Sequence, residues 1–228
     1  GFAEDIILPY YIEKRKKLNR RYISIFNING AHGFLYKRLV EALGIPVLIV
    51  TDLDIKRENE DEDEGESVDN TKAKKTVSYA QVNCLKGKET TNATIIDLKG
   101  DSDLSNISTF IEKDNLRLAY QGKINGYYAT SFEEALILNN YDNEVINNIL
   151  KELKPRIYTN IVGIKPDYKK NIDNSYKWQV KLSNCKGEFA SKLLYHIVNE
   201  DVEEKIPQLP KYISDGLDWI EQKLVGGK

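Results

Sequence analysis

The stretch Pro46-Val47-Leu48-Ile49-Val50-Thr51-Asp52-Leu53-Asp54 decides the fold class that the sequence predicts. Its first five residues form a continuous apolar run, which is typical of a strand buried on both faces of a parallel sheet. Before it, residues 34–43 carry apolar side chains at helical spacing, and Gly44 is suited to ending a helix. Residues 22–28 are rich in β-forming side chains. A strand, a helix and a strand joined by short turns predict an α/β fold with a mostly parallel sheet flanked by helices.

The pattern changes along the 228-residue chain and predicts two parts. Residues 1–130 are expected to form the α/β core. They include a charged insertion at 56–75 that is dense in acids and poor in apolar side chains. Residues 131–228 are expected to form a mainly helical extension that completes the active site. The other expected elements are a helix within 6–17, strands at 77–82, 94–96 and 116–120, helices at 131–139, 143–152, 187–198 and 211–224, and an irregular segment at 157–180.

Composition narrows the class of protein. The net charge of −2 supplies no global field that would attract DNA, so any contact with nucleic acid must come from local basic patches. Cys84 and Cys185 lack the spacing of a zinc site or a disulfide framework. No apolar stretch is long enough to cross a bilayer, and the acidic start is unlike a signal peptide. We therefore expect a cytoplasmic protein without membrane contact. Because methionine is absent, we also expect a fragment, or a chain whose methionines are not represented.

Asp52 and Asp54 follow the apolar run directly. Open α/β sheets bind ligands beyond the carboxyl ends of their strands. Two carboxylates one residue apart at that edge are hard oxygen ligands that suit Mg²⁺, and their mutual repulsion favours a cation between them. On spacing alone, a solvated strand end that carries two acids is an equally good interpretation.

Three further places carry residues that could join such a site. Glu4 opens the first predicted helix, where an acid also suits the helix dipole. Ser131 and Glu134 have capping-box spacing, which gives Glu134 a structural role and leaves Glu133 free to face a site. Lys186 precedes a predicted helix and becomes a candidate only if the acids converge near it.

Several segments that occur in order over nearly the whole chain together carry a family resemblance. They are Gly1-Phe2-Ala3-Glu4 with Ile6-Ile7-Leu8-Pro9, Gly30-Ala31-His32, Leu43 to Asp54, Thr90 to Thr94, Arg117 to Gln121, Ser131 to Ala135, Lys186 to Ala190, Pro210 to Ile213 and Gly216 to Trp219. With these segments the sequence resembles the C-terminal Toprim catalytic region of class 2 nucleases of the OLD (overcoming lysogenization defect) family. The resemblance implies that the first Glu of the Toprim acidic motif falls one residue before Gly1. The insertion after Asp54 is longer and more charged than this family's pattern.

This resemblance implies a DNA endonuclease or nickase that uses two Mg²⁺ or Mn²⁺ ions about 4 Å apart. It also implies an upstream ABC-type ATPase region in the same polypeptide, a UvrD/Rep-type helicase as a possible partner, and a role in defence against phage. On this basis Lys186 neutralises charge on the phosphate and Arg117 holds a phosphate, although a strand-surface arginine is an equally good interpretation of Arg117. The assigned metal ligands are Glu4, Asp52, Asp54 and Glu133, with Ser131 and Glu134 as possible auxiliaries, and the assigned catalytic residues are Asp52, Asp54, Glu133 and Lys186.

Other interpretations remain open. A phosphatase of the haloacid-dehalogenase type also carries Asp-x-Asp after a buried strand, with Asp52 as the nucleophile, but position 56 is Lys where that family has Thr or Ser. A Toprim enzyme of the topoisomerase or primase kind is disfavoured by the segments at 131–135 and 186–190. A Toprim module that binds DNA without catalysis is the third alternative.

Overall fold

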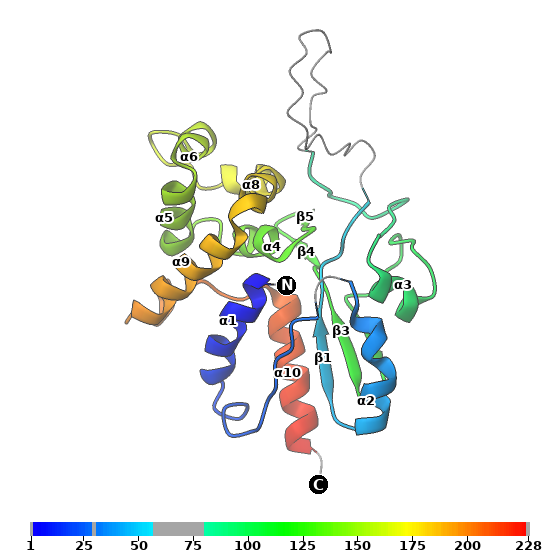
Figure 1. The fold of residues 1–228 in the computed structure, drawn as a ribbon. Helices are drawn as coiled ribbons and strands as arrows, with labels where there is room; N and C mark the ends of the chain where they lie inside the picture. The colour runs from blue at the N-terminus through cyan, green and yellow to red at the C-terminus, as the bar shows by residue number, and fades with distance from the viewer. Residues whose placement is uncertain (1, 29–30, 57–79, 227–228) are drawn as a thin grey trace, which may run out of the picture.

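The computed structural model describes residues 2–28, 31–56 and 80–226. One part, here called the α/β part, gathers around a core that includes Leu53, Ile95 and Leu118 (Figure 1). Its elements are η1 (Gly33–Tyr36), α2 (Lys37–Leu43), β1 (Val47–Val50), α3 (Ala93–Lys99), β2 (Phe110–Lys113) and β3 (Leu116–Ala119).

The sheet of the α/β part has the order β1-β3-β2. β1 pairs with β3 in parallel, so that Val50 lies opposite Ala119, and β2 pairs with β3 in the antiparallel direction. The α/β prediction is confirmed, with a sheet that is mixed among the described residues. A separate hairpin joins β4 (Lys123–Ile124) to β5 (Tyr127–Tyr128) through Asn125 and Gly126, whose positive φ angles suit a tight hairpin turn.

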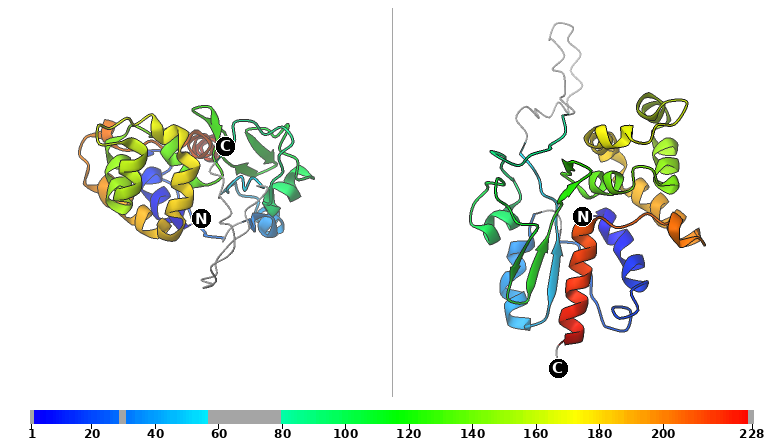
Figure 2. Two further views of the ribbon diagram at one scale, coloured as in Figure 1. Left: turned by 90° about the horizontal axis from the view of Figure 1, so that it is seen from above. Right: turned by 180° about the vertical axis from the view of Figure 1, so that it is seen from behind.

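Helices cover the two faces of β1 (Figure 2). On one face Leu48 packs against Gly216 of α10 (Lys211–Gly226), where an added Cβ would lie 2.8 Å from Leu48 Cδ1. On the other face Ile49 packs against Gly33, where an added Cβ would lie 3.1 Å from Ile49 Cγ2. Glycine at both positions lets the helix backbones approach the strand closely.

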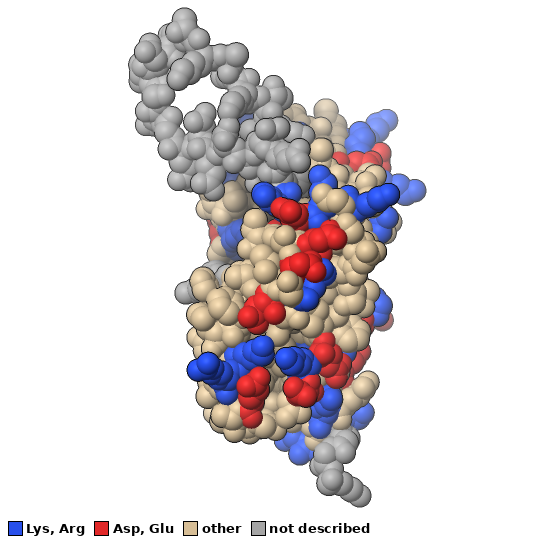
Figure 3. Space-filling view, turned by 90° about the vertical axis from the view of Figure 1, so that its right-hand side faces the viewer, with Lys and Arg blue, Asp and Glu red and all other residues tan. Residues whose placement is uncertain are grey.

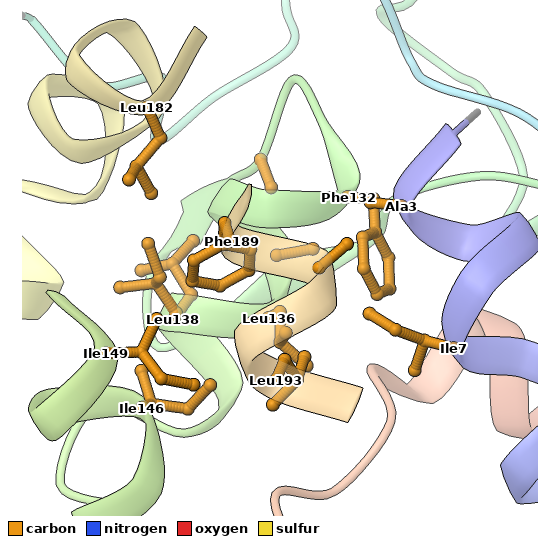
Figure 4. Packing of buried hydrophobic residues seen from close by; sticks show 14 of the residues in the cluster. Ala3, Ile7, Phe132, Leu136, Leu138, Ile146, Ile149, Leu182, Phe189 and Leu193 are labelled. Atoms are coloured by element: carbon orange, nitrogen blue, oxygen red, sulfur yellow. The ribbon is translucent and has the colours of Figure 1, made fainter. Parts of the chain in front are cut away.

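The second part, here called the helical part, has its own core (Figure 4). α1 comes from the start of the chain, yet Ala3 and Ile7 are buried in this core and α1 packs against α9 and α4. In space, therefore, α1 groups with helices that follow residue 130, and the sequence division at that residue stays a prediction. The helices are α1 (Phe2–Glu13), α4 (Phe132–Asn139), α5 (Glu144–Leu153), α6 (Pro155–Val162), α7 (Lys170–Asp173), α8 (Ser175–Leu182) and α9 (Lys186–Asn199), with short 3-10 turns at Ser183–Cys185 and Glu203–Lys205.

Most of the predicted elements are confirmed. The exceptions are informative. Residues 94–96, predicted as a strand, lie in α3, and the irregular segment predicted at 157–180 contains α6, α7 and α8. Residues 22–28 form no strand, because Tyr22 and Phe26 are 96% and 78% exposed and bury no apolar face.

Two predicted segments lie largely outside the described residues. Of the strand predicted at 77–82, residues 77–79 are not described, while Val82 forms an isolated antiparallel bridge with Tyr128. The predicted insertion at 56–75 is not described beyond Lys56. Among the described helices, none combines the length and the apolar character needed to cross a membrane.

Candidate metal centre

Carboxylates from three separate segments converge at the C-terminal end of β1. Asp52 is half-buried there, and its pKa is raised to about 7. Burial is the largest cause, and the negative charges of Glu4, Asp54 and Glu133 add to it. Burial also raises the pKa of Asp54. These four acids therefore lie near one another, while their assignment as metal ligands stays a prediction.

Core packing places the two glutamates. Glu4 lies in the first turn of α1 and Glu133 in the first turn of α4, and both are buried. Each follows a residue of the helical core, since Ala3 and Phe132 are 1% exposed. Figure 4 shows Ala3 and Phe132 facing one another where α1 meets α4. The packing of these neighbours fixes the starts of both helices and thereby positions the glutamates.

The residues beside Glu133 hold the helix start. Ser131 is the N-cap of α4 and accepts a hydrogen bond from the Glu134 N–H at 3.3 Å. Glu134 is fully buried. Its Oε2 accepts from the Thr130 N–H at 2.8 Å and the Thr130 hydroxyl at 3.0 Å, and its Oε1 accepts from the Ser175 hydroxyl at 2.9 Å. The predicted cap is present, with the reciprocal bond made to Thr130 instead of Ser131. Because both residues are engaged in capping, we leave Ser131 and Glu134 out of the proposed ligand set.

Lys186 brings a positive charge to the acids. It is the first residue of α9, and its Nζ lies 3.2 Å from Oε2 of Glu133. Burial acts to lower the pKa of Lys186, but the charges of Glu133, Asp52 and Glu4 outweigh it, and the pKa is raised. Lys186 also lies near enough to Asp54 to act against the rise in that residue's pKa. The acids therefore lie close to Lys186, which was the condition for counting Lys186 as a candidate site residue.

Two amide side chains, which the sequence analysis did not assign to the site, hold the two aspartates. Gln121, just beyond β3, donates to Oδ1 of Asp52 at 2.6 Å and accepts from the Leu53 N–H at 2.6 Å. Asn92, the N-cap of α3, donates to Oδ2 of Asp54 at 2.9 Å and to the Asp52 carbonyl at 2.8 Å. Asn92 could have been found, because Asn before and Gly100 after residues 93–99 are helix-end signals.

Tyr212 is another neighbour that the sequence analysis did not single out. It lies in the first turn of α10, is 8% exposed, and its hydroxyl accepts from Nε2 of Gln121 at 3.4 Å. Its pKa is raised well above the usual value, first by burial and then by the charges of Asp52, Glu4 and Glu133. The phenol therefore stays protonated and places a neutral hydroxyl at the edge of the acid group.

Arg117 lies apart from the acids. It is in β3 opposite Leu48, two residues before the strand ends, and its guanidinium stacks 3.7 Å from the centre of the Phe110 ring. Its partner across the sheet is Glu112 of β2. This placement matches a strand-surface arginine and gives no support to the predicted phosphate contact, so Arg117 is not part of the proposed site.

The donor set fits a divalent cation. Four carboxylates lie near Lys186, and the pKa of Asp52 is raised first by burial and then by the negative charges of the other three acids. Carboxylate oxygens are the ligands that Mg²⁺ prefers. Within the described ranges, no three His, Cys, Asp or Glu side chains already stand close enough to hold an ion. The carboxylates would therefore have to draw together around a cation.

Two comparisons with known proteins cover the residues described above. Residues 1–54, which include Glu4, Asp52 and Asp54, match the family model described as "Overcoming lysogenization defect protein-like, TOPRIM domain". Nearly the whole chain (99%) is 49% identical to Endonuclease GajA of Bacillus cereus (strain HuB5-5), of which it spans 31%. No solved structure matches the chain. The two matches confirm that this chain resembles the Toprim region of OLD-family nucleases.

Proposed function

We propose that this chain is the catalytic part of an OLD-type DNA endonuclease that depends on divalent metal ions. The observation that carries the proposal is the convergence of Glu4, Asp52, Asp54 and Glu133, with Lys186 beside them. The match to an endonuclease supports the reaction class. Because the chain spans 31% of that relative, control by an ATPase region elsewhere in the polypeptide, a UvrD/Rep-type helicase partner and a role in phage defence are also proposals.

Glu4, Asp52, Asp54 and Glu133 would hold the metal, with room in the donor set for two ions. When bound, Mg²⁺ or Mn²⁺ would activate water and stabilise charge on the phosphodiester oxygens. Lys186 is a fixed cation that stays protonated, so it can bind a phosphate oxygen and offset charge that develops there. Its ion pair with Glu133 holds the ammonium at the site before substrate arrives.

The charge distribution supports a polyanionic substrate that is bound by more than the site itself. We call residues 14–21 the basic loop, because six of its eight residues are Lys or Arg. Buried Leu18 and ion pairs from Arg15 to Asp218 and from Lys17 to Glu221 anchor it beside α10. By contrast, the face over α2 and α3 carries acids and bases intermixed (Figure 3).

Three cations of the basic loop remain available for phosphates. Lys16, Arg20 and Arg21 are exposed and make no ion pair in the described part of the chain. Glu4 lies in the first turn of α1 and the basic loop follows its last residue, Glu13, so about 14 Å of helix lies between them, a distance that a DNA duplex can bridge. We therefore propose that the basic loop binds the DNA backbone while the acid group holds the cleaved phosphate.

The direct test of the proposed function is cleavage of supercoiled plasmid by the full-length protein with Mg²⁺ or Mn²⁺. Asp52→Asn and Glu133→Gln should each lower the rate by at least about 100-fold, since each removes a metal-binding charge. Asp201→Asn is the matched control, because Asp201 is exposed and lies in the segment between α9 and α10. Cleavage at the unaltered rate by both site variants would overturn the proposal.

A second test addresses the basic loop. Replacing Lys16, Arg20 and Arg21 with Ala in the Asp52→Asn background should weaken duplex binding and reduce its salt dependence by about 0.9 in the log–log slope for each phosphate that the protein no longer neutralises. Alanine at Lys151, Arg156 and Lys165, which are exposed cations of the helical part, is the matched control. An identical slope in both triple variants would remove the basic loop from the interface.

A further inference from the structure

The two aspartates of the candidate centre share an unusual form of support. Each carboxylate accepts a hydrogen bond from an uncharged side-chain amide, Asp52 from Gln121 and Asp54 from Asn92. A Lys or Arg partner would orient a carboxylate and also offset its charge. An amide orients it and leaves its negative charge in place.

Backbone N–H groups fix which way each amide points. The Gln121 carbonyl oxygen accepts from the Leu53 N–H at 2.6 Å, so its NH₂ group must be the end that faces Asp52. A backbone N–H cannot accept a hydrogen bond, and a flipped amide would therefore break both hydrogen bonds. Gln121 is thus held as a donor to Asp52.

Asn92 is held in the same way by a different element. Its Oδ1 accepts from the N–H groups of Thr94 and Ile95 at 3.0 and 3.2 Å, as an N-cap does. Its Nδ2 is left to donate to Oδ2 of Asp54 and to the Asp52 carbonyl. The side chain is fully buried, and its orientation is tied to the start of α3.

Further hydrogen bonds stabilise the backbone turn between Asp52 and Asp54. Asp54 has a φ of 44°, in the left-handed region that a residue with a side chain seldom adopts. The Asp54 carbonyl accepts from the Thr91 N–H at 3.0 Å, and the Leu53 carbonyl accepts from the Thr90 hydroxyl at 2.7 Å. Segments after β3 and before α3 therefore surround the turn and hold it.

We propose that Gln121 and Asn92 are positioning residues of this centre, which direct the second oxygen of each carboxylate, Asp52 Oδ2 and Asp54 Oδ1, towards bound cations. The inference rests on the proposed metal-dependent function and deepens it. One oxygen of each aspartate is engaged by an amide, so each aspartate binds through its other oxygen. Gln121 also reaches the hydroxyl of Tyr212, which links this arrangement to the start of α10.

The test is calorimetric titration of Mn²⁺ into the metal-free full-length protein. Gln121→Met keeps the length of the side chain and removes both hydrogen bonds. Asn92→Ser keeps an N-cap acceptor for α3 and removes the donor to Asp54. Each variant should weaken Mn²⁺ binding by about 10- to 100-fold, the usual effect of losing a group that orients a ligand.

Matched variants separate positioning from a general loss of structure. Gln208→Met changes an exposed glutamine, and Asn143→Ser changes the N-cap of α5, where the asparagine caps a helix outside the centre. Both should bind Mn²⁺ as the unaltered protein does. Thermal unfolding without metal measures the stability that each cap variant loses, and Asn92→Ser should lose more than Asn143→Ser because it also loses the buried hydrogen bonds to Asp54 and the Asp52 carbonyl.

The outcomes distinguish this inference from the proposed function. If the unaltered protein binds no Mn²⁺, the proposed function fails. If it binds Mn²⁺ and both Gln121→Met and Asn92→Ser bind as tightly, the proposed function stands and the positioning inference is overturned. Equal losses of affinity in Asn92→Ser and Asn143→Ser would also overturn it. Should Gln121→Met fail to fold, the comparison of Asn92→Ser with Asn143→Ser still decides.

Discussion

The α/β part and the helical part hold their acids at the centre by different physical means. In the α/β part, amide hydrogen bonds from Gln121 and Asn92 orient Asp52 and Asp54. In the helical part, Glu4 and Glu133 are placed by the core residues beside them. Hydrogen bonds act on single side chains, whereas core packing places whole helices. Ligand position should therefore be separable from stability in the α/β part, whereas in the helical part a loss of core packing should lower stability and disturb ligand position together.

The largest expected effect tests the helical part. Phe132 is a fully buried core residue next to Glu133, so Phe132→Ala should lower the free energy of unfolding by about 3–5 kcal/mol. It should also weaken Mn²⁺ binding, because the start of α4 would no longer pack against α1. Denaturant unfolding and calorimetry on the same sample measure both. If Phe132→Ala is strongly destabilised but still binds Mn²⁺ with full affinity, core packing at Phe132 does not position Glu133.

A pH titration of stability tests the α/β part. Asp52 has a pKa of about 7 in the fold against 3.8 for an ordinary Asp, so the fold keeps a proton that the unfolded chain releases. Without metal, stability should be highest below about pH 4, fall as pH rises towards 7 and then level off, by up to about 4 kcal/mol. Mn²⁺ should offset the loss above pH 7, because the ion takes the place of the proton.

Asp52→Asn is the control for this profile, since it cannot titrate and should remove most of the fall between pH 4 and 7. Asp201→Asn should keep the profile of the unaltered protein. Stability that rises from pH 4 to 7 in the metal-free protein would contradict the burial of Asp52 and the crowding of carboxylates around it at the end of β1.

The sequence predicts the elements that depend on interactions between neighbouring residues better than those that depend on contacts between residues far apart in the chain. The apolar run before Asp52, the helix cap at Ser131 and the ends of α9 and α10 are local signals, and they predicted those elements correctly. Asn92 also carries a local signal, but reading 94–96 as a strand hid it, because Thr and Ile favour strands when their flanks are ignored.

The support from Gln121 could not be derived from local patterns. Gln121 and Asp52 are 69 residues apart, and only the parallel pairing of β1 with β3 brings their strand ends together. Two of the helices within 157–180 were missed for a related reason. Asn171 of α7 and Trp178 of α8 form a buried hydrogen bond at 2.9 Å, a tertiary interaction that local patterns do not reveal. By contrast, α6 carries local signals that could have been recognised, a proline in its first turn and buried residues at helical spacing.

The adjacent acids Glu133 and Glu134 allow effects on stability and on metal binding to be compared within one turn of α4. Glu134→Gln removes a buried charge-assisted acceptor, so stability should fall by about 1.5–3 kcal/mol while Mn²⁺ affinity changes little. Glu133→Gln should do the opposite and mainly weaken Mn²⁺ binding. Thermal unfolding of both variants measures the loss of stability, and calorimetry measures the loss of Mn²⁺ affinity. The assignment of roles fails if Glu134→Gln loses Mn²⁺ affinity as strongly as Glu133→Gln.

The smallest effect concerns the cap that starts α4. Ser131→Ala removes the hydroxyl that accepts from the Glu134 N–H at 3.3 Å, which should destabilise the protein by about 1 kcal/mol. Because Glu134 still holds Thr130 through two hydrogen bonds, the start of α4 should stay in place. Mn²⁺ affinity should then remain within about twofold of that of the unaltered protein, well short of the tenfold change that about 1.4 kcal/mol of binding free energy represents. A tenfold loss of affinity would mean instead that the Ser131 hydroxyl belongs to the ligand set, as the sequence alone allowed.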